Sequence, residues 1–139
     1  MEWAALITWV ATAGFGFALL LIWVARGGMT QRAGIRPFLI ISHFLLAATG
    51  LVIWIAYVAT DNDALAWIAL VILAVVALLG WTMAAIWYKR RKSRGAVAEA
   101  VDPGTPAEQH FPVPVVAVHG VLAVTTVVLV LLTALDVGS

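Results

Sequence analysis

Four long apolar stretches constrain this chain more than any other feature of its sequence. They cover residues 4–25, 37–59, 64–88 and 113–135, and none of them contains Asp, Glu, Lys or Arg. Each is long enough to cross roughly 30 Å of hydrocarbon at about 1.5 Å per helical residue. A spanning segment must satisfy its own backbone hydrogen bonds, so the pattern predicts helices. We therefore expect an all-α, four-helix transmembrane bundle in which residues 1–139 form a single domain.

The basic residues predict an orientation in the membrane. All eight lie in two loops, between the first and second spans and between the third and fourth. Because positive loops stay in the cytoplasm, both termini are expected outside, with a flexible cytoplasmic loop at 89–112. We interpret the first span as a retained helix and the protein as a multi-pass protein of a bacterial inner membrane. The eight basic residues are Arg26, Arg32, Arg36, Lys89, Arg90, Arg91, Lys92 and Arg94.

Two repeated sequence patterns indicate that a helical hairpin has been duplicated. Gly16 is followed at offsets six and seven by Ile-Trp, and Gly80 is followed by the same pair at the same offsets. The pattern His-x-x-Leu-Ala-x-Thr begins at His43 and again at His119. Since each repeat holds two spans, a pseudo-twofold axis along the membrane normal should relate the halves. The two histidines then become equivalent positions.

The paired histidines are the strongest candidates for a binding site. His43 lies six residues after Pro37, and His119 lies five residues after Pro114, so their depths match. An imidazole inside a membrane is costly and is usually retained for a function. Two such rings on two helices predict the axial ligands of one haem b. On a helix, positions i+4 and i+7 share the histidine's face, and small residues there would admit a flat macrocycle; they are Ala47, Gly50, Ala123 and Thr126, with Gly120 next to His119.

Other residues are candidates for holding the periphery of such a group. Arg36 and Arg32 lie just outside the second span and would reach the haem propionates, although they would equally contact lipid phosphates. Phe44 follows His43 directly and is a candidate wall for the macrocycle. Packing is the alternative explanation for its ring.

Alternative roles for the histidines remain open at this level. The rings would equally serve as hydrogen-bonding groups that hold neighbouring helices together, or as partners for a quinone. A metal held by protein alone fits less well, because no carboxylate or thiol lies at their depth and the chain has no cysteine. The third histidine, His110, lies at the membrane edge and is expected to be solvated. No catalytic residue and no nucleic-acid partner is predicted.

In these features the chain resembles the four-helix membrane b-type cytochromes, a group that includes the cytochrome b561-like proteins and the membrane anchors of several respiratory dehydrogenases. The resemblance consists of four spans, histidines on the second and fourth, and flanking basic loops. It implies one bis-histidine haem at His43 and His119 and single-electron transfer with a quinol or a redox protein. Members with two haems usually present four such histidines, whereas this chain has two. The alternatives are a non-catalytic accessory or assembly subunit of a membrane complex, and a quinone-binding module.

Overall fold

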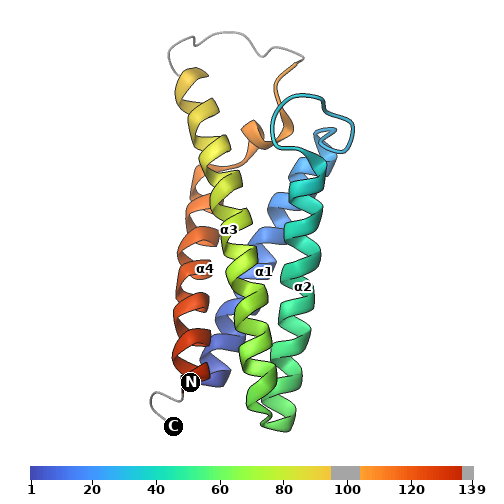
Figure 1. Ribbon diagram of the computed structural model, residues 1–139. Coiled ribbons are helices and arrows are strands. Elements are labelled where there is room, and N and C mark those ends of the chain that lie inside the picture. Colours follow the sequence, from blue (N-terminus) through green and yellow to red (C-terminus); the bar gives the residue numbers. More distant parts are fainter. Residues whose placement is uncertain (95–103, 136–139) are drawn as a thin grey trace.

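The fold is a bundle of four long helices (Figure 1). The computed structural model describes residues 1–94 and 104–135. Its elements are α1 (Glu2–Ala25), α2 (Pro37–Thr60), α3 (Asp63–Arg94), the short 3-10 helix η1 (Ala107–His110) and α4 (Val113–Ala134). All four long helices are long and apolar enough to cross a membrane, so the predicted transmembrane four-helix bundle is confirmed.

Local sequence signals explain several helix boundaries. Pro37 begins α2 directly after the extended residue Arg36, which suits a residue that lacks an N–H group and has a fixed φ. The helix ends at Thr60, and the C-cap residue Asp61 donates its N–H to the carbonyl of Tyr57 at 2.8 Å. Asp61 has a left-handed φ of 53°, which turns the chain out of the helix. The side chain of Asn62 then accepts a hydrogen bond from the N–H of Ala64 at 3.1 Å. The resulting turn between α2 and α3 is very short.

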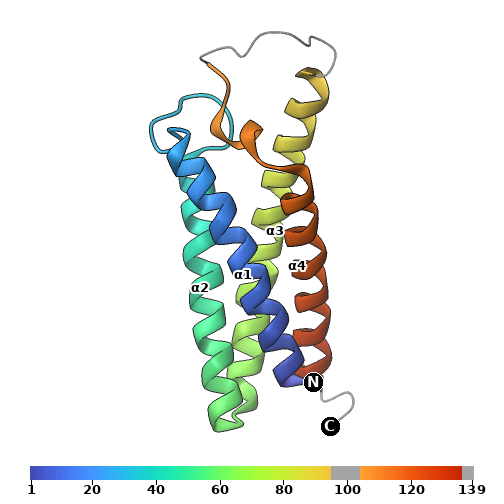
Figure 2. The same cartoon turned by 180° about the vertical axis from the view of Figure 1, so that it is seen from behind.

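The helices form a square in which each helix packs against its neighbours in sequence, and α1 and α4 close the ring. Helix α1 packs against α4 and α2, and α3 packs against α2 and α4. Within the described residues the backbones of α1 and α3 do not approach each other closely, and neither do those of α2 and α4, so each of these pairs lies on a diagonal. Figures 1 and 2 show the same order from opposite sides. Both histidine-bearing helices therefore face each other across the interior.

Burial follows the predicted duplication. Positions of α1 and α3 correspond at a spacing of 64 residues, and positions of α2 and α4 at a spacing of 76 residues. Most residues that are buried in one half have a buried counterpart in the other half, as expected if both hairpins present the same faces inward. The buried pairs are Ala5 and Ala69, Trp9 and Leu73, Thr12 and Val76, Trp23 and Trp87, Gly50 and Thr126, and Trp54 and Val130.

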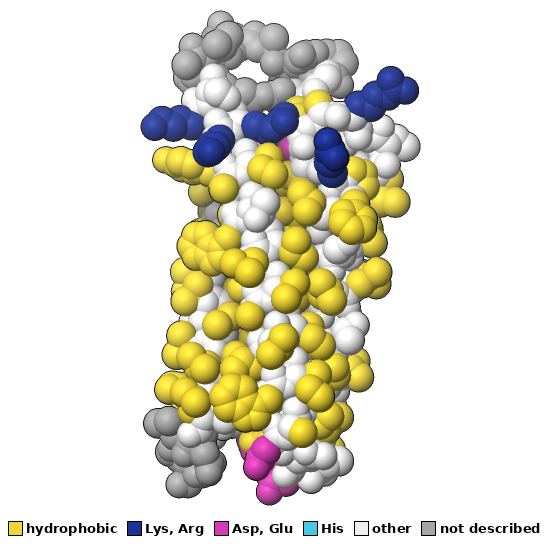
Figure 3. Space-filling view, viewed as in Figure 1, with side chains coloured by type: hydrophobic (Ala, Val, Ile, Leu, Met, Phe, Trp, Pro, Cys, Tyr) yellow, Lys and Arg dark blue, Asp and Glu magenta, His cyan; other side chains and the backbone are white. Residues whose placement is uncertain are grey.

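The outer surface is apolar along the length of the bundle and charged at its two ends (Figure 3). Large exposed residues such as Ile7, Val52 and Leu78 would be costly in water and suit contact with lipid tails. We call the end that carries the arginines and lysines the basic end. The opposite end, with Glu2, Asp61 and Asp63, is the acidic end.

The segment 89–112 differs from the flexible loop that the sequence predicts. Helix α3 continues through Lys89 to Arg94, because these residues favour helix and no glycine or proline interrupts them. Residues 104–112 fold against the bundle and include η1, which packs on α1 and α3. Both of these parts therefore have helical structure where a flexible loop was expected, and the middle of the segment, 95–103, lies outside the described residues.

Candidate functional site

The two predicted histidines meet in the interior of the bundle. His43 on α2 and His119 on α4 are both half-buried, and their ring centroids lie 6.4 Å apart. The ring planes are inclined by 64°. Because α2 and α4 are diagonal to each other and their backbones do not approach closely, the two rings bridge the centre of the square. The predicted equivalence of these positions therefore brings the rings together.

Each ring is fixed by a hydrogen bond to the main chain of a neighbouring helix. Nδ1 of His43 lies 3.0 Å from the carbonyl oxygen of Val76 on α3, and Nδ1 of His119 lies 2.9 Å from that of Thr12 on α1. A carbonyl can only accept, so Nδ1 donates in both bonds. The two acceptors are 64 residues apart and are thus equivalent positions of the repeat.

These bonds leave Nε2 of both rings available. In a neutral imidazole whose Nδ1 carries the proton, Nε2 presents a lone pair. No protein atom of residues 1–94 or 104–135 forms a hydrogen bond with Nε2 of His43 or His119. A ring held through Nδ1–H by a backbone carbonyl is the usual form of a metal-ligating histidine.

The repeated glycines make room for the histidine rings. A Cβ atom on Gly16 would lie 2.9 Å from Cε1 of His119, and one on Gly80 would lie 3.3 Å from Cε1 of His43. Both distances are shorter than an ordinary contact of about 3.5–4.0 Å between carbon atoms. The sequence marked these glycines as echoes of a duplication. The structure shows in addition that each glycine lets a histidine ring pack closely against the helix that carries the glycine.

The predicted histidine faces point inward. Ala47 and Ala123 are half-buried, and both Gly50 and Thr126 are buried. Gly50, however, accommodates a different neighbour, since a Cβ atom there would lie 3.0 Å from Cζ2 of Trp9. Gly50 therefore packs against Trp9, towards the acidic end, and not against a histidine ring.

Two of the predicted lining residues lie away from the interior. Gly120 is exposed, and a Cβ atom added to it would meet nothing within 4 Å. We do not retain it in the site. Phe44 is 37% exposed and contacts Phe17 of α1, with ring centroids 6.5 Å apart. Its ring therefore closes the seam between α1 and α2 beside His43.

Arg32 and Arg36 are exposed at the basic end. Arg36 immediately precedes α2, and His43 lies near that same N-terminal end of the helix. Neither arginine forms an ion pair with a carboxylate of the described residues. Their predicted role towards propionates stays a prediction.

A threonine pair links α1 and α4 next to His119. The hydroxyl groups of Thr12 and Thr126 lie 3.3 Å apart in the buried interior. Both hydroxyls also bond back to their own helices, Thr12 to the carbonyl of Thr8 at 2.7 Å and Thr126 to that of Leu122 at 2.8 Å. Each hydroxyl has one proton, so at most one of the two donates to the other while the second donates to its own helix. Among the described residues neither hydroxyl bonds to an imidazole.

Sequence reasoning missed a buried carboxylate at the basic end. Glu108 of η1 has no exposed surface. Its Oε1 accepts the N–H of Ile35 at 2.9 Å, and its Oε2 accepts Nε2 of Gln31 at 3.0 Å. Gln31 in turn accepts the N–H of Ala107 at 2.8 Å. Nothing in the local sequence around Glu108 signals this, because its partners are 73 and 77 residues away.

The donor set limits the metals that the site could hold. The described residues contain no group of three or more His, Cys, Asp or Glu side chains close enough to share a metal ion. Two imidazoles alone do not complete the three or four protein ligands that zinc requires. They do suffice where a macrocycle supplies the remaining ligands. Comparisons with models of known families, with curated proteins and with solved structures find no match for this chain.

Proposed function

We propose that this membrane protein binds one haem b between His43 and His119 and transfers single electrons to or from a quinol or a redox protein. We further propose that it resides in a bacterial inner membrane with the basic end in the cytoplasm. The observation that carries the proposal is the pair of neighbouring rings, inclined edge to face with centroids 6.4 Å apart. Each is held through Nδ1 by an equivalent carbonyl, and Nε2 has no hydrogen-bond partner among the described residues. This is the form of donor set that a bis-histidine haem requires.

The separation of the rings supports a shared metal. Two imidazole nitrogens that each lie about 2 Å from one metal ion are roughly 4 Å apart. Adding the distance from nitrogen to ring centre on both sides gives centroids about 6 Å apart, by the same geometry. The observed 6.4 Å is close to this value. The inclination of the ring planes is compatible with a shared ligand, because ligation by two imidazoles does not require their planes to be parallel.

The surrounding chain would supply orientation, a dry environment and hydrogen-bond donors. Thr12 and Val76 fix the rings through their carbonyl groups. Towards the basic end, Nε1 of Trp23 and of Trp87 are buried and have no hydrogen-bond partner among the described residues. Buried donors normally have partners, so these two N–H groups suit the acid groups of a bound macrocycle. The haem itself would supply the one-electron chemistry.

The protonation pattern favours a metal over a quinone. A neutral ring that donates from Nδ1 has only an acceptor at Nε2, whereas a quinone carbonyl also accepts. Nε2 and the quinone oxygen would then both be acceptors, and no hydrogen bond could form between them. The same nitrogens are suited to a metal ion, so this hydrogen-bond pattern favours haem over a bound quinone.

Asparagine substitutions test the proposal. An asparagine at position 43 or 119 retains an N–H donor near the carbonyl of Val76 or Thr12 but lacks the second ring nitrogen. We expect the full-length protein, expressed with added haem precursor, to show a b-type reduced-minus-oxidised spectrum. His43→Asn and His119→Asn should each abolish it. His110→Asn is the matched control, because His110 also contacts a backbone carbonyl, that of Ala107 at 3.3 Å, but lies at the basic end.

A colourless wild-type protein after haem-supplemented expression would contradict the proposal. So would a spectrum that survives both substitutions. Helical content measured by circular dichroism must be unchanged in the variants, so that loss of the chromophore reports ligation and not unfolding.

The second candidate function is a non-catalytic subunit of a larger membrane complex. The favouring observation is that both histidine bonds already connect neighbouring helices, α2 with α3 and α4 with α1, as purely structural bonds would. Polar bonds of this kind contribute about 0.6 kcal/mol on average between membrane helices. On this view the wild type is colourless, and His43→Asn leaves both stability and complex formation nearly unchanged.

A further inference from the structure

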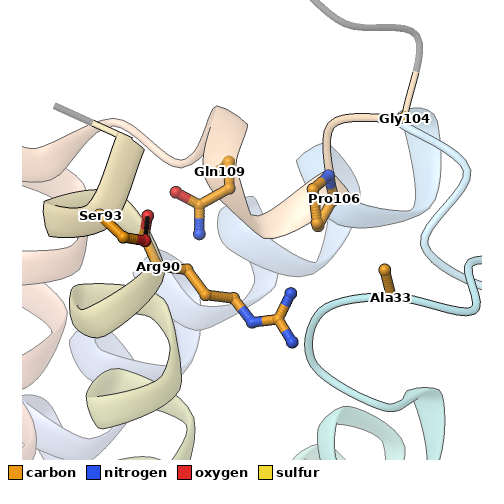
Figure 4. A pocket seen from close by; sticks show the side chains of 6 residues that line it. All are labelled: Ala33, Arg90, Ser93, Gly104, Pro106 and Gln109. Carbon is orange, nitrogen blue, oxygen red and sulfur yellow. Dashed lines mark hydrogen bonds between the residues drawn. The ribbon is translucent and has the colours of Figure 1, made fainter. Parts of the chain in front are cut away.

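A cavity at the basic end has the chemistry of an anion site. It has a volume of about 240 Å³, is partly open to the surface, and is bounded by three parts of the chain: the loop before α2, the last turns of α3, and the segment that leads into and includes η1 (Figure 4). The cavity does not adjoin the histidines. Its lining consists of Ala33, Arg90, Ser93, Gly104, Pro106 and Gln109.

Two of the side chains that line this cavity, Arg90 and Gln109, carry N–H donors. Figure 4 shows the guanidinium group of Arg90 extending beneath Gln109 towards Ala33. Nε2 of Gln109 is buried and finds no hydrogen-bond partner among residues 1–94 and 104–135. A buried donor without an acceptor is unfavourable, and an anionic oxygen would relieve it.

No carboxylate of the described residues neutralises the charge of Arg90 in this cavity. Arg90 forms no ion pair within that part of the chain, and no acidic residue lines the cavity. Glu108 is adjacent to Gln109 in sequence, but both of its oxygens are bonded to Ile35 and Gln31. The described residues therefore offer Arg90 no acidic partner.

The neighbouring basic residues are placed differently. Arg91 lies over the ring of Trp87, with its guanidinium carbon 5.6 Å from the ring centroid. Lys89 and Lys92 are exposed, as Arg90 is, but they do not line the cavity. The cavity thus singles out Arg90 from a cluster that otherwise resembles any basic membrane flank.

We propose that this cavity binds a phosphate group, held by the guanidinium of Arg90 and the side-chain amide of Gln109. The planar guanidinium suits two oxygens of one phosphate, and the amide supplies a further neutral donor. The basic residues at this end of the bundle lie where lipid headgroups meet a spanning protein. The phosphate would come either from a lipid headgroup or from a soluble phosphate compound. This proposal is independent of haem binding.

Two binding experiments on the purified full-length protein separate these sources. Inorganic phosphate is titrated in detergent by calorimetry, and phosphatidylglycerol retention is measured by native mass spectrometry. In whichever experiment the wild type binds its ligand, Arg90→Gln should weaken binding at least about tenfold, as expected for loss of a charge-assisted bond. Gln109→Glu, which places a carboxylate in the cavity, should weaken it as well.

Lys89→Gln is the matched control, since it removes one positive charge from the adjacent residue outside the cavity. Its affinity should stay within about twofold of the wild type. Binding in the lipid arm alone identifies a headgroup, and binding in the titration alone identifies a soluble phosphate. Equal losses in Arg90→Gln and Lys89→Gln would show that only net charge matters and would overturn the proposal. Failure of the wild type in both arms would overturn it too.

Discussion

Gly16→Ala probes the contact between α1 and the ring of His119. The added Cβ atom would lie 2.9 Å from Cε1 and 3.3 Å from Nδ1 of that ring. The ring cannot retreat freely, because Nδ1 is bonded to the carbonyl of Thr12 on the same helix, 2.9 Å away. To restore an ordinary carbon contact of about 3.5 Å, the ring must move by roughly half an ångström and stretch this bond.

The magnitude follows from two opposing terms. Overpacking of a well-packed interior costs about 1–3 kcal/mol. Replacing a helical glycine by alanine gains about 0.5–1 kcal/mol from the backbone. Gly14→Ala carries the same backbone gain, yet a Cβ atom there would meet nothing within 4 Å. The difference between Gly16→Ala and Gly14→Ala therefore isolates the steric term, expected at about 1–3 kcal/mol.

Equilibrium unfolding in mixed micelles of neutral and denaturing detergent measures these free energies. Gly80→Ala serves as a graded comparison, because its Cβ atom would lie 3.3 Å from Cε1 of His43 and needs a smaller shift. We expect its cost to be less than half that of Gly16→Ala. If Gly16→Ala is as stable as Gly14→Ala, then His119 is not held against α1, and the geometry on which the haem proposal rests is wrong.

Three further substitutions test neighbouring contacts. Thr12→Val should leave any haem spectrum unchanged, because the acceptor for His119 is a backbone carbonyl, while unfolding measurements should show a loss of up to about 1 kcal/mol from the threonine pair. Glu108→Gln turns an amide N–H₂ group towards a backbone or side-chain donor and should cost about 1–3 kcal/mol, with faster hydrogen exchange at the amide of Ile35. Gly34→Ala should destabilise the same contact by at least about 1 kcal/mol in thermal unfolding, because Gly34 has a φ of +93° and its Cβ atom would collide with the carboxylate of Glu108.

The fold was predictable because its main constraint is local. Each apolar stretch must form a helix in hydrocarbon whatever the other stretches do. The inward direction of the histidines was predictable as well, since helical periodicity places Gly50 with His43 and Thr126 with His119, and both partners are buried. The repeat then supplied the pairing of the two rings.

Features that depend on contacts between distant segments were not predictable. Glu108 lies in a stretch rich in Ala and Pro that looks solvated, and it is buried only because the loop around Gly34 folds over it. Gly120 was assigned to the site for its sequence proximity to His119. One residue along a helix turns by about 100°, which carries Gly120 from the inner face to the outer surface.

The two halves differ where only packing is required. Towards the acidic end, Trp9 and Trp54 contact each other with ring centroids 6.3 Å apart. Their counterparts in the second half are the smaller Leu73 and Val130, which are equally buried. An interior tolerates such exchanges if the total volume is filled. Duplication by itself therefore does not keep equivalent positions alike.

At the level of the histidines the halves stay alike in every element that positions a ring. His43 and His119 share the same bond type, to carbonyls of equivalent residues, and each ring lies over a glycine, Gly80 or Gly16. Two independent structural bonds would need neither matched depth nor rings that meet 6.4 Å apart across a diagonal where the helix backbones do not approach closely. A single ligand bound from both sides needs all of these at once, and this requirement favours one shared metal over two separate helix contacts.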